Sequence, residues 1–321
     1  MENVLVTGGA GFIGSNIAEA LLAQGCRVVI LDDLSTGKME NILSLGDQAN
    51  YKFVKGSILD SGLLTSLLTS EKIKHISHQA AVSSVSKSIA DPVGTMETNV
   101  TGTANLFQVA SACGCKRIVY ASSSSIYGDS PELPKRETMP LCPQSPYAMS
   151  KAAKELLGRV YSHLYGIEIV GLRYFNVYGR RQDPRSDYAA VIPKFITKAL
   201  ANDPITIEGD GCQTRDFIYI DDVVQANIKA LAGSQNSGAV FNVAYGTQTS
   251  IIELATMILD LTNSDSEVVF KPSRSGDVRD SVGDIEYAMR ELGYSRDYDI
   301  KAGLAETIAW FQEHTVRRCA A

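Results

Sequence analysis

A glycine-rich turn near the start of the chain does most to limit the folds that the chain can adopt. It reads Gly8-Gly9-Ala10-Gly11-Phe12-Ile13-Gly14, with the spacing GxxGxxG, between a strand-like run at 4–7 and a helical pattern at 12–24. Glycines in such a turn allow a tight bend, close approach of the backbone to a pyrophosphate, and close helix–strand packing. The N-terminus of the helix presents free N–H groups and a positive dipole end to phosphates. The motif is weak alone, but its place between a strand and a helix indicates a nucleotide site.

Short apolar runs alternate with longer amphipathic stretches through the first half of the chain. Buried strands are expected at 4–7, 27–31, 51–54, 74–78 and 117–122, with helices between them, for example at 99–112. Alternation of this kind predicts a parallel sheet with helices on both faces and right-handed crossovers. The expected fold class is therefore α/β, with a doubly wound parallel sheet of the Rossmann type.

The second half of the chain is less regular. Strands are expected at 205–207, 216–220 and 240–243, helices at 221–232, 251–261 and 302–314, and a polar loop at 183–187. We therefore expect a nucleotide-binding Rossmann domain over 1–175 and a smaller mixed α/β substrate-binding lobe over 176–321. The boundary is soft, because a strand near 216–243 can return to the first sheet.

Length and charge exclude several classes of protein. At 321 residues the chain is too long for one small core. Its 30 Lys and Arg residues against 36 Asp and Glu residues give a net charge of −6, which argues against a general nucleic-acid binder. No apolar run reaches the roughly 18 residues that a membrane span needs. The chain starts directly with a strand-like run, so no signal peptide is expected.

The cysteines and histidines indicate neither a disulfide framework nor a metal site. The six cysteines contain no CxxC pair, and their spacing predicts a reduced protein of the cytoplasm. His75, His78, His163 and His314 show no HxxxH or HExxH spacing, so no metal is expected. Packing is the simpler role for His75 and His78.

The second expected strand ends in Asp32-Asp33, roughly 20 residues after the glycines. A carboxylate at this place can accept both hydroxyls of an adenosine ribose, and it would repel a 2′-phosphate. Because no Arg adjoins the pair, NAD is favoured over NADP as the cofactor. A capped strand end is the simpler alternative.

Tyr147 and Lys151 stand four residues apart, shortly after Ser145-Pro146. Ser145 can cap a helix and Pro146 suits its first turn, so Tyr147 and Lys151 would share one helix face. An ammonium near a phenol favours the phenolate and lowers its pKa from about 10, which lets Tyr147 act as a general base. An exposed helix pair is the alternative, since the YxxxK spacing is common by chance.

A run of hydroxyls, Ser122-Ser123-Ser124-Ser125, ends the fifth expected strand. Side chains at the carboxyl ends of parallel strands point into the ligand crevice. One of these hydroxyls can therefore hydrogen-bond a reacting oxygen, and a serine-rich turn is the alternative.

Taken together, these motifs resemble the extended short-chain dehydrogenase/reductases that act on nucleotide sugars, over nearly the whole chain. The segments that carry the resemblance are GxxGxxG, Asp32, His78-Gln79-Ala80-Ala81, Asn99, the serine run, YxxxK, Arg173-Tyr174-Phe175-Asn176-Val177-Tyr178-Gly179 and Arg215-Asp216-Phe217. Within this family the chain is most similar to UDP-N-acetylglucosamine 4-epimerases. That similarity lies in Gly179-Arg180-Arg181-Gln182-Asp183-Pro184, Tyr188-Ala189-Ala190-Val191-Ile192-Pro193 and Ser275-Gly276-Asp277-Val278-Arg279.

The resemblance implies roles for individual residues. The implied catalytic set is Ser123, Tyr147 as the base, and Lys151, which also holds the nicotinamide ribose. The implied NAD contacts are Gly8, Gly11, Phe12, Ile13, Gly14, Asp32, Asp33, Ser35, Thr36, Gly37, Ser57, Ile58, Gln79, Ala80, Ala81, Asn99, Ser122, Tyr147, Lys151 and Tyr174. The implied substrate contacts are Ser84, Ser123, Ser124, Tyr147, Asn176, Ala190, Val191, Thr206, Arg215, Arg274, Asp277 and Ser281.

The resemblance implies a more specific contact for some of these residues. Asn176, Arg215 and Arg274 match positions that bind the nucleotide diphosphate, and Asp277 matches one that meets the uridine ribose. Two arginines on a diphosphate are electrostatically reasonable. Relatives commonly carry an Asp where this chain has Ser57, after the glycine of the third-strand segment, and Ser57 can still hydrogen-bond the adenine.

The residues after Ser123 separate the reactions of this family. Related 4,6-dehydratases carry an Asp-Glu pair where this chain has Ser124-Ser125, and related decarboxylases carry a Glu at the position of Ser125. Because neither carboxylate is present, the acid–base work of those reactions is not supplied. The resemblance therefore implies an isomerase, a 4-epimerase that removes and returns a hydride at C4 through a transient 4-keto sugar.

Ser281 aligns with the position where a bulky Tyr closes the pocket of enzymes restricted to UDP-glucose and UDP-galactose. A small Ser leaves volume for an N-acetyl group, which implies interconversion of UDP-N-acetylglucosamine and UDP-N-acetylgalactosamine and also of UDP-glucose and UDP-galactose. A UDP-glucose 4-epimerase restricted to non-acetylated sugars, a UDP-glucuronate 4-epimerase and a non-catalytic NAD-binding regulator stay open as alternatives. The family also implies a homodimer through helices at 99–112 and 146–165.

Overall fold

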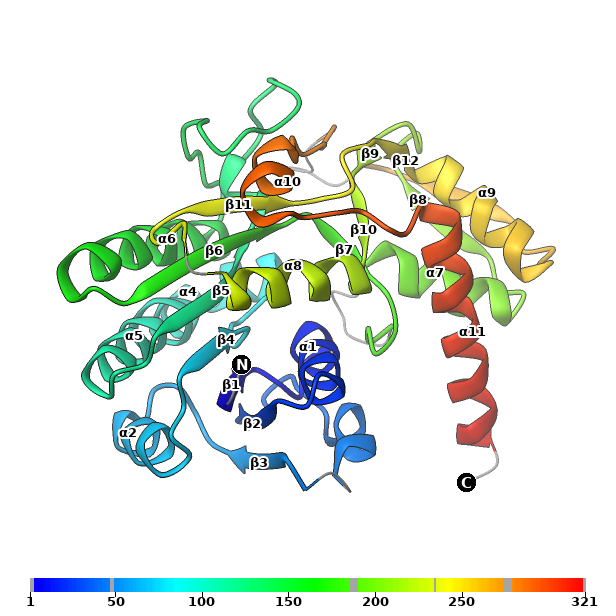
Figure 1. Ribbon diagram of the computed structural model, residues 1–321. Coiled ribbons are helices and arrows are strands. Elements are labelled where there is room, and N and C mark those ends of the chain that lie inside the picture. The colour runs from blue at the N-terminus through cyan, green and yellow to red at the C-terminus, as the bar shows by residue number, and fades with distance from the viewer. Residues whose placement is uncertain (1–2, 47–48, 185–189, 234, 274–278, 320–321) are drawn as a thin grey trace.

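The structure is a computed structural model that describes residues 3–46, 49–184, 190–233, 235–273 and 279–319 (Figure 1). Its main element is a seven-stranded sheet with the order β11-β6-β5-β4-β1-β2-β3, in which every neighbouring pair is parallel. The sheet confirms the expected α/β fold class. Its strands are β1 (Asn3–Thr7), β2 (Arg27–Asp32), β3 (Tyr51–Lys55), β4 (His75–His78), β5 (Arg117–Ser123), β6 (Glu168–Tyr174) and β11 (Val240–Val243).

Helices cover both faces of this sheet. Helices α1 and α8 pack together on one face, while α2, α5 and α6 follow one another across the other (Figure 1). The helices that build these layers or flank them are α1 (Phe12–Ala23), α2 (Ser61–Ser70), α3 (Val85–Ala90), α4 (Pro92–Met96), α5 (Gly102–Ala112), α6 (Pro146–Tyr165) and α8 (Ile220–Ala232). A π-helical turn, η3 (Glu97–Thr101), joins α4 to α5, and the 3₁₀ turns are η1 (Met39–Asn41), η2 (Leu43–Leu45) and η4 (Ser124–Tyr127).

The two-residue period of a strand explains why the sheet has two cores. Val4 and Val6 of β1 belong to the apolar cluster under α1 and α8, whereas Leu5 belongs to the cluster under α2 and α5. Successive side chains of a strand point to opposite faces, so a run that is apolar at every position is stable only when both faces are covered.

The second half of the chain adds short parallel and antiparallel pairs and more helices. The pairs are β7 (Asn176–Tyr178) with β10 (Phe217–Tyr219), β9 (Thr214–Arg215) with β12 (Thr249–Ser250), and β8 (Ile205–Glu208) with β13 (Val268–Lys271). The helices are α7 (Val191–Leu200), α9 (Ile251–Thr262), α10 (Glu286–Leu292) and α11 (Ile300–Cys319). Figure 1 shows α7, α9 and α11 gathered to one side of the large sheet.

Several strands differ from the sequence prediction, since β7, β9, β12 and β13 are additional short strands. β6 was not among the expected strands, although it pairs with β5 along its full length. The strand expected at 216–220 ends at Tyr219, because Ile220 begins α8. Asp221 and Asp222 stand in the first turn of that helix, where carboxylates suit the dipole. The later strand that was expected to return to the first sheet is β11, which pairs with β6 at its edge.

Candidate active site

The glycine turn between β1 and α1 is closed to larger residues. Gly8 has a φ of +68°, and a Cβ there would lie 2.6 Å from the backbone nitrogen of Ala80. A Cβ on Gly14 would lie 2.2 Å from the carbonyl oxygen of Gly8. Gly11 is the N-cap of α1 and supplies no side-chain cap. The first turn of α1 therefore presents backbone N–H groups beside a bare backbone, which suits a pyrophosphate.

Asp32 lies beside this turn at the end of β2. Its carboxylate is buried and accepts hydrogen bonds from the backbone N–H of Ala10 at 2.9 Å and of Leu34 at 2.8 Å. Burial raises the pKa of this carboxyl, against the two backbone donors that lower it. A Cβ on Gly37 would lie 2.7 Å from Asp32 Oδ1, so Gly37 also keeps the carboxylate accessible. Asp33, Ser35 and Thr36 follow on an exposed loop, where Ser35 N–H donates to Asp33.

The order of the strands reverses between β1 and β4, and several of the predicted cofactor contacts lie at that point. Ligands of doubly wound sheets bind where the strand order reverses, outside the carboxyl ends of the strands. Gln79 follows β4, and its N–H donates to the carbonyl of Thr7 at 3.0 Å. Tyr174, at the end of β6, donates to the Gln79 side chain at 3.2 Å. Ala80 lies against Gly8, and Ala81 follows it.

Three other predicted cofactor contacts are occupied by internal hydrogen bonds. Asn99 is fully buried, accepts from Val82 N–H at 2.8 Å and donates to Ser150 Oγ at 2.9 Å. Ser122 donates to Glu155 at 2.5 Å, and Ser57 accepts from Leu59 N–H at 3.2 Å. The remaining predicted contacts have simple places: Phe12 and Ile13 begin α1, and Ile58 is buried where a Cβ on Gly102 would touch it.

Helix α6 brings the predicted catalytic residues together. Ser145 caps it by accepting from Ala148 N–H at 3.1 Å, and Pro146 occupies its first turn. The Lys151 Nζ atom lies 5.5 Å from the centroid of the Tyr147 ring and donates to the carbonyl of Ala121 at 3.0 Å. Ser123 ends β5 and hydrogen-bonds the Tyr147 phenol. A hydroxyl, a phenol and an amine thus converge at the carboxyl end of β5.

The electrostatics of this group differ from the sequence prediction. Burial raises the pKa of Tyr147, and the hydrogen bond with Ser123 is the influence that lowers it. The expectation that Lys151 lowers the pKa of the phenol is therefore wrong for the protein alone. Burial lowers the pKa of Lys151 itself to about 8, so this amine loses its proton more readily than an exposed lysine would.

Sequence reasoning missed a buried basic cluster under the catalytic residues. Lys154 is fully buried on α6, and its Nζ atom lies 3.2 Å from Nε2 of His78, which is also fully buried. His78 Nδ1 lies 2.7 Å from the Thr7 hydroxyl, and Nε2 lies 2.9 Å from the Thr103 hydroxyl. Burial lowers the pKa of both Lys154 and His78 well below their usual values, and the charge of Lys151 lowers both further. The spacing of Lys154, three residues after Lys151, was the available signal.

An ion pair lies next to this cluster and ties α6 to the sheet. Glu155 and Arg173 are each 2 % exposed and meet at 2.7 Å. Glu155 also accepts from Ser122, and Arg173 donates to the phenol of Tyr127 at 2.8 Å. Tyr127 in turn donates to Asn242 of β11. This chain of contacts fixes α6 against β5, β6 and β11.

The predicted substrate contacts fall into two groups. Asn176 donates from its side chain to the carbonyl of Asp216 at 3.0 Å, and Arg215 donates to the carbonyl of Arg279 at 3.1 Å, two residues before the half-buried Ser281. Ser124 begins the turn after Ser123, and Ser84 caps α3. A second group lies on the packed elements α7 and β8, namely Ala190, Val191 and Thr206. Arg274 and Asp277 lie outside the described residues.

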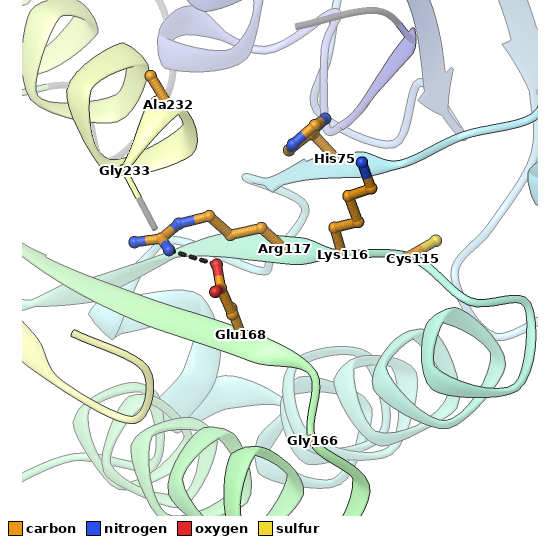
Figure 2. A pocket seen from close by; sticks show the side chains of 8 residues that line it. All are labelled: His75, Cys115, Lys116, Arg117, Gly166, Glu168, Ala232 and Gly233. Atoms are coloured by element: carbon orange, nitrogen blue, oxygen red, sulfur yellow. Dashed lines mark hydrogen bonds and ion pairs between the residues drawn. The ribbon is translucent and has the colours of Figure 1, made fainter. Parts of the chain in front are cut away.

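A cavity of about 540 Å³ lies elsewhere, at the amino ends of β4, β5 and β6 (Figure 2). Arg117 and Glu168 form an ion pair of 2.6 Å in its wall. None of the predicted site residues lines it, and parallel sheets bind ligands at the opposite edge.

Over the described ranges no cluster of three or more His, Cys, Asp or Glu side chains could hold a metal ion. In the same part of the chain, no helix combines the length and apolarity needed to cross a membrane.

Comparison with known proteins places this geometry in a family. A model described as the NAD dependent epimerase/dehydratase family matches residues 4–244. A UDP-glucose 4-epimerase of Mycolicibacterium smegmatis is 41 % identical over 309 residues, which cover 96 % of this chain and 98 % of that protein. Among solved structures, a UDP-glucose 4-epimerase of Thermotoga maritima with UDP-glucose has a TM-score of 0.92 at 35 % identity, covering 98 % of this chain and 99 % of the other. A UDP-N-acetylglucosamine 4-epimerase of Methanobrevibacter ruminantium, in complex with UDP-N-acetylmuramic acid, has a TM-score of 0.92 at 39 % identity, covering 97 % and 98 %.

Proposed function

Because the chain belongs to the NAD-dependent epimerase/dehydratase family, we propose that it is an isomerase, an NAD-dependent 4-epimerase of UDP-sugars. In finer terms, we propose that it interconverts UDP-N-acetylglucosamine and UDP-N-acetylgalactosamine, and also UDP-glucose and UDP-galactose. The observation that carries the proposal is the convergence of Ser123, Tyr147 and Lys151 at the carboxyl end of β5, on the same edge of the parallel sheet as the glycine turn after β1.

The residues at the sheet edge fit NAD. Gly8 and Gly14 let the backbone of the turn pack closely against Ala80 and against itself, since a Cβ on either would collide with backbone atoms, and the first turn of α1 follows with free N–H groups. The buried carboxylate of Asp32, at the end of β2, is proposed to hold the hydroxyls of the adenosine ribose. Lys151 would hold the nicotinamide ribose. Bound NAD would supply the hydride acceptor and donor for C4 of the sugar.

The side chains of the protein supply the proton chemistry. Tyr147 is proposed to take the proton from O4 as the hydride leaves and to return it when the hydride returns. Burial raises the pKa of this phenol in the protein alone, and the positive charge of a bound nicotinamide ring would lower it. Ser123 hydrogen-bonds the oxygen that becomes the 4-keto group, and also the phenol. Inversion at C4 requires the keto sugar to turn between the two transfers, so binding must come from the UDP rather than the sugar. Asn176 and Arg215 are the described residues proposed to hold the diphosphate, and Arg274 and Asp277 are proposed as well.

Ser124 and Ser125 favour epimerisation over elimination of water. Dehydratases that resemble this chain use a carboxylic acid and a carboxylate at this place, and Ser124-Ser125 supplies neither. The proposed substrate range rests on Ser281, because a serine is smaller than the tyrosine that closes the pocket in similar enzymes restricted to UDP-glucose and UDP-galactose. A UDP-glucose 4-epimerase restricted to non-acetylated sugars and a UDP-glucuronate 4-epimerase are the alternatives.

Product analysis decides between these substrates. The purified protein with NAD is incubated separately with each of the four UDP-hexoses and with UDP-glucuronate, and the products are separated by chromatography and identified by NMR. Conversion of the acetylated pair supports the proposal. Conversion of glucuronate or of the non-acetylated pair alone favours an alternative. Tyr147→Phe is the matched control, because it removes one oxygen, and it should lower kcat by at least about 10²-fold. A wild type that turns over none of these sugars would point to a non-catalytic NAD-binding regulator.

We also propose a homodimer of this chain, located in the cytoplasm as the cysteine spacing predicts. One face of α6 is apolar and exposed at a spacing of seven, four and four residues, and helices α3 and α4 pack beside it. The exposed apolar residues are Met149, Leu156, Val160 and Leu164 of α6, Val85 and Ile89 of α3, and Val93 of α4. α5, expected to share this contact, has no large exposed apolar side chain. Light scattering should give a mass of twice the 34.6 kDa of one chain. The double substitution Leu156→Glu with Val160→Glu should reduce the measured mass to that of a single chain.

A further inference from the structure

We propose that Asp216 is a positioning residue for the UDP-sugar, which holds the wall of the sugar pocket against the diphosphate-binding residues. The proposal rests on the function proposed above and deepens it. Asp216 follows Arg215 in the Arg215-Asp216-Phe217 segment, and its own side chain had no assigned role in the sequence prediction.

The carboxylate of Asp216 is used entirely inside the protein. It is fully buried, and its Oδ1 atom accepts from Tyr245 N–H at 2.8 Å. Its Oδ2 atom accepts from Gly246 N–H and from Gly283 N–H, each at 3.0 Å. Gly283 lies two residues after Ser281. One side chain therefore anchors the end of β11 and the segment that carries the residue proposed to set substrate size.

The backbone of the same residue anchors the diphosphate side. The carbonyl of Asp216 accepts from the backbone N–H of Asn176 at 3.1 Å and from the Asn176 side chain at 3.0 Å. Asn176 thus takes its orientation from Asp216 on two atoms. This double contact fixes the amide that is proposed to bind the diphosphate.

The pocket wall is the segment 279–283, which includes Ser281. Thr214 and Arg215, the neighbours of Asp216, hydrogen-bond the start of this segment. Arg215 donates to the carbonyl of Arg279, and that carbonyl also accepts from Thr214 N–H at 3.0 Å. The Thr214 hydroxyl donates to Asp280 at 2.6 Å. Contacts at 279–280 and at 283 hold the wall on both sides of Ser281. Three segments distant in sequence therefore meet at residues 214–216.

Removing the charge of Asp216 should loosen this arrangement. Three backbone N–H groups depend on the two carboxylate oxygens, and an amide in place of the carboxylate offers one oxygen and a nitrogen that cannot accept. Either the N–H group of Tyr245, or those of Gly246 and Gly283 together, would lose its acceptor. The wall would then move relative to Asn176 and Arg215, while Tyr147 and Lys151 on α6 keep their contacts.

Asp222 offers a matched control. It is 1 % exposed, and burial raises its pKa to about 6, as it does for Asp216. Its carboxylate accepts from the backbone N–H of Asp297 at 2.9 Å. The segment around Asp297 carries no predicted substrate contact. Asp222→Asn therefore repeats the chemical change of Asp216→Asn in a similar environment, away from the sugar pocket.

The experiment compares Asp216→Asn and Asp222→Asn, both loaded with NAD, in kcat and KM for the UDP-sugar that the wild type converts. Asp216→Asn should raise KM at least tenfold more than Asp222→Asn does, with kcat lowered less than threefold. Any smaller separation in KM, or a loss confined to kcat, overturns the proposal. Turnover by the wild type tests the proposed function separately, because a failure of the inference changes only the comparison of the two variants.

A second measurement avoids the risk that Asp216→Asn does not fold. Protonation of Asp216 in the wild type should have the same effect, and its pKa of about 6 places this within reach. Arg296 lowers this pKa, and Asp216 is in turn among the groups that raise the pKa of the Tyr294 phenol, after burial and Asp222. KM for the UDP-sugar, whose diphosphate diester does not titrate in this range, should rise as the pH falls from 7 to 5 in both the wild type and Asp222→Asn. A constant KM, or a rise that disappears in Asp222→Asn, overturns the proposal.

Discussion

Replacing Lys154 with methionine tests whether the buried side chain of this α6 residue carries an uncharged amine in the folded protein. Lys154 is fully buried, and within the described residues it forms no ion pair. Its hydrogen-bond partner is the ring of His78, at 3.2 Å. Methionine has a similar length and no charge, so it changes the proton balance with little change in volume.

The expected magnitude follows from proton linkage. Burial lowers the pKa of Lys154 well below 10.5 in the folded protein, and Lys151 lowers it further. Between the folded and the unfolded pKa, the unfolded chain binds one proton more than the folded chain. Stability therefore rises with pH in that window, by about 1.4 kcal/mol for each pH unit. Lys154→Met lacks this proton, so its unfolding free energy lacks the rise.

The assay is urea unfolding of both proteins with saturating NAD at several values of pH up to 10. The difference in unfolding free energy should move in favour of the wild type by about 1.4 kcal/mol per pH unit as the pH approaches 10.5. The lost hydrogen bond to His78 adds a constant of about 1 kcal/mol that leaves the slope unchanged. Lys301→Met, on the exposed surface of α11, should give no slope. A slope of zero for Lys154→Met would refute the reasoning, because Lys154 would then keep its proton in the folded state.

Three further changes test other parts of the site. Ser281→Tyr should abolish conversion of acetylated UDP-sugars and spare the non-acetylated pair; equal losses in the product assay count against the role of Ser281. Gly14→Ala should weaken NAD binding at least tenfold by calorimetry, since its Cβ would lie 2.2 Å from the Gly8 carbonyl oxygen, and an unchanged affinity would contradict this. Glu155→Gln should cost about 3–5 kcal/mol in urea unfolding, because it leaves the guanidinium of Arg173 buried without its charge partner. A loss of unfolding free energy below about 1 kcal/mol would show that the ion pair of Glu155 with Arg173 does not hold α6 against β6.

The first five strands could be predicted because their apolar runs are local. β6 could not, since Glu168 and Arg173 interrupt its apolar pattern. Arg173 is buried there because Glu155 of α6 neutralises it, and that partner stands 18 residues away in the sequence. A window that reads only neighbouring residues assigns such a charge to the surface.

The same limit applies to the site. Tyr147, Lys151 and Ser123 stand in motifs with fixed spacing, so the sequence alone indicated them, and their roles remain a prediction. Lys154 and Asp216 carry charges that ordinarily face water. The spacing of Lys154 from Lys151 is the one local signal for Lys154, and it does not show which partner the amine contacts. Only the packing of α6 on β4, and of β10 against β7, shows where these charges lie.

The return of β11 to the sheet has a consequence for how the protein is made. β6 gains its outer partner only when residues 240–243 arrive, so a ribosome-bound chain that ends near residue 180 exposes the backbone N–H and C=O groups of β6 along one edge. Exposed edges of this kind pair readily with other chains. Synthesis of the intervening 60 or so residues therefore sets a period of aggregation risk. A fragment cut after residue 175 would keep that edge permanently open.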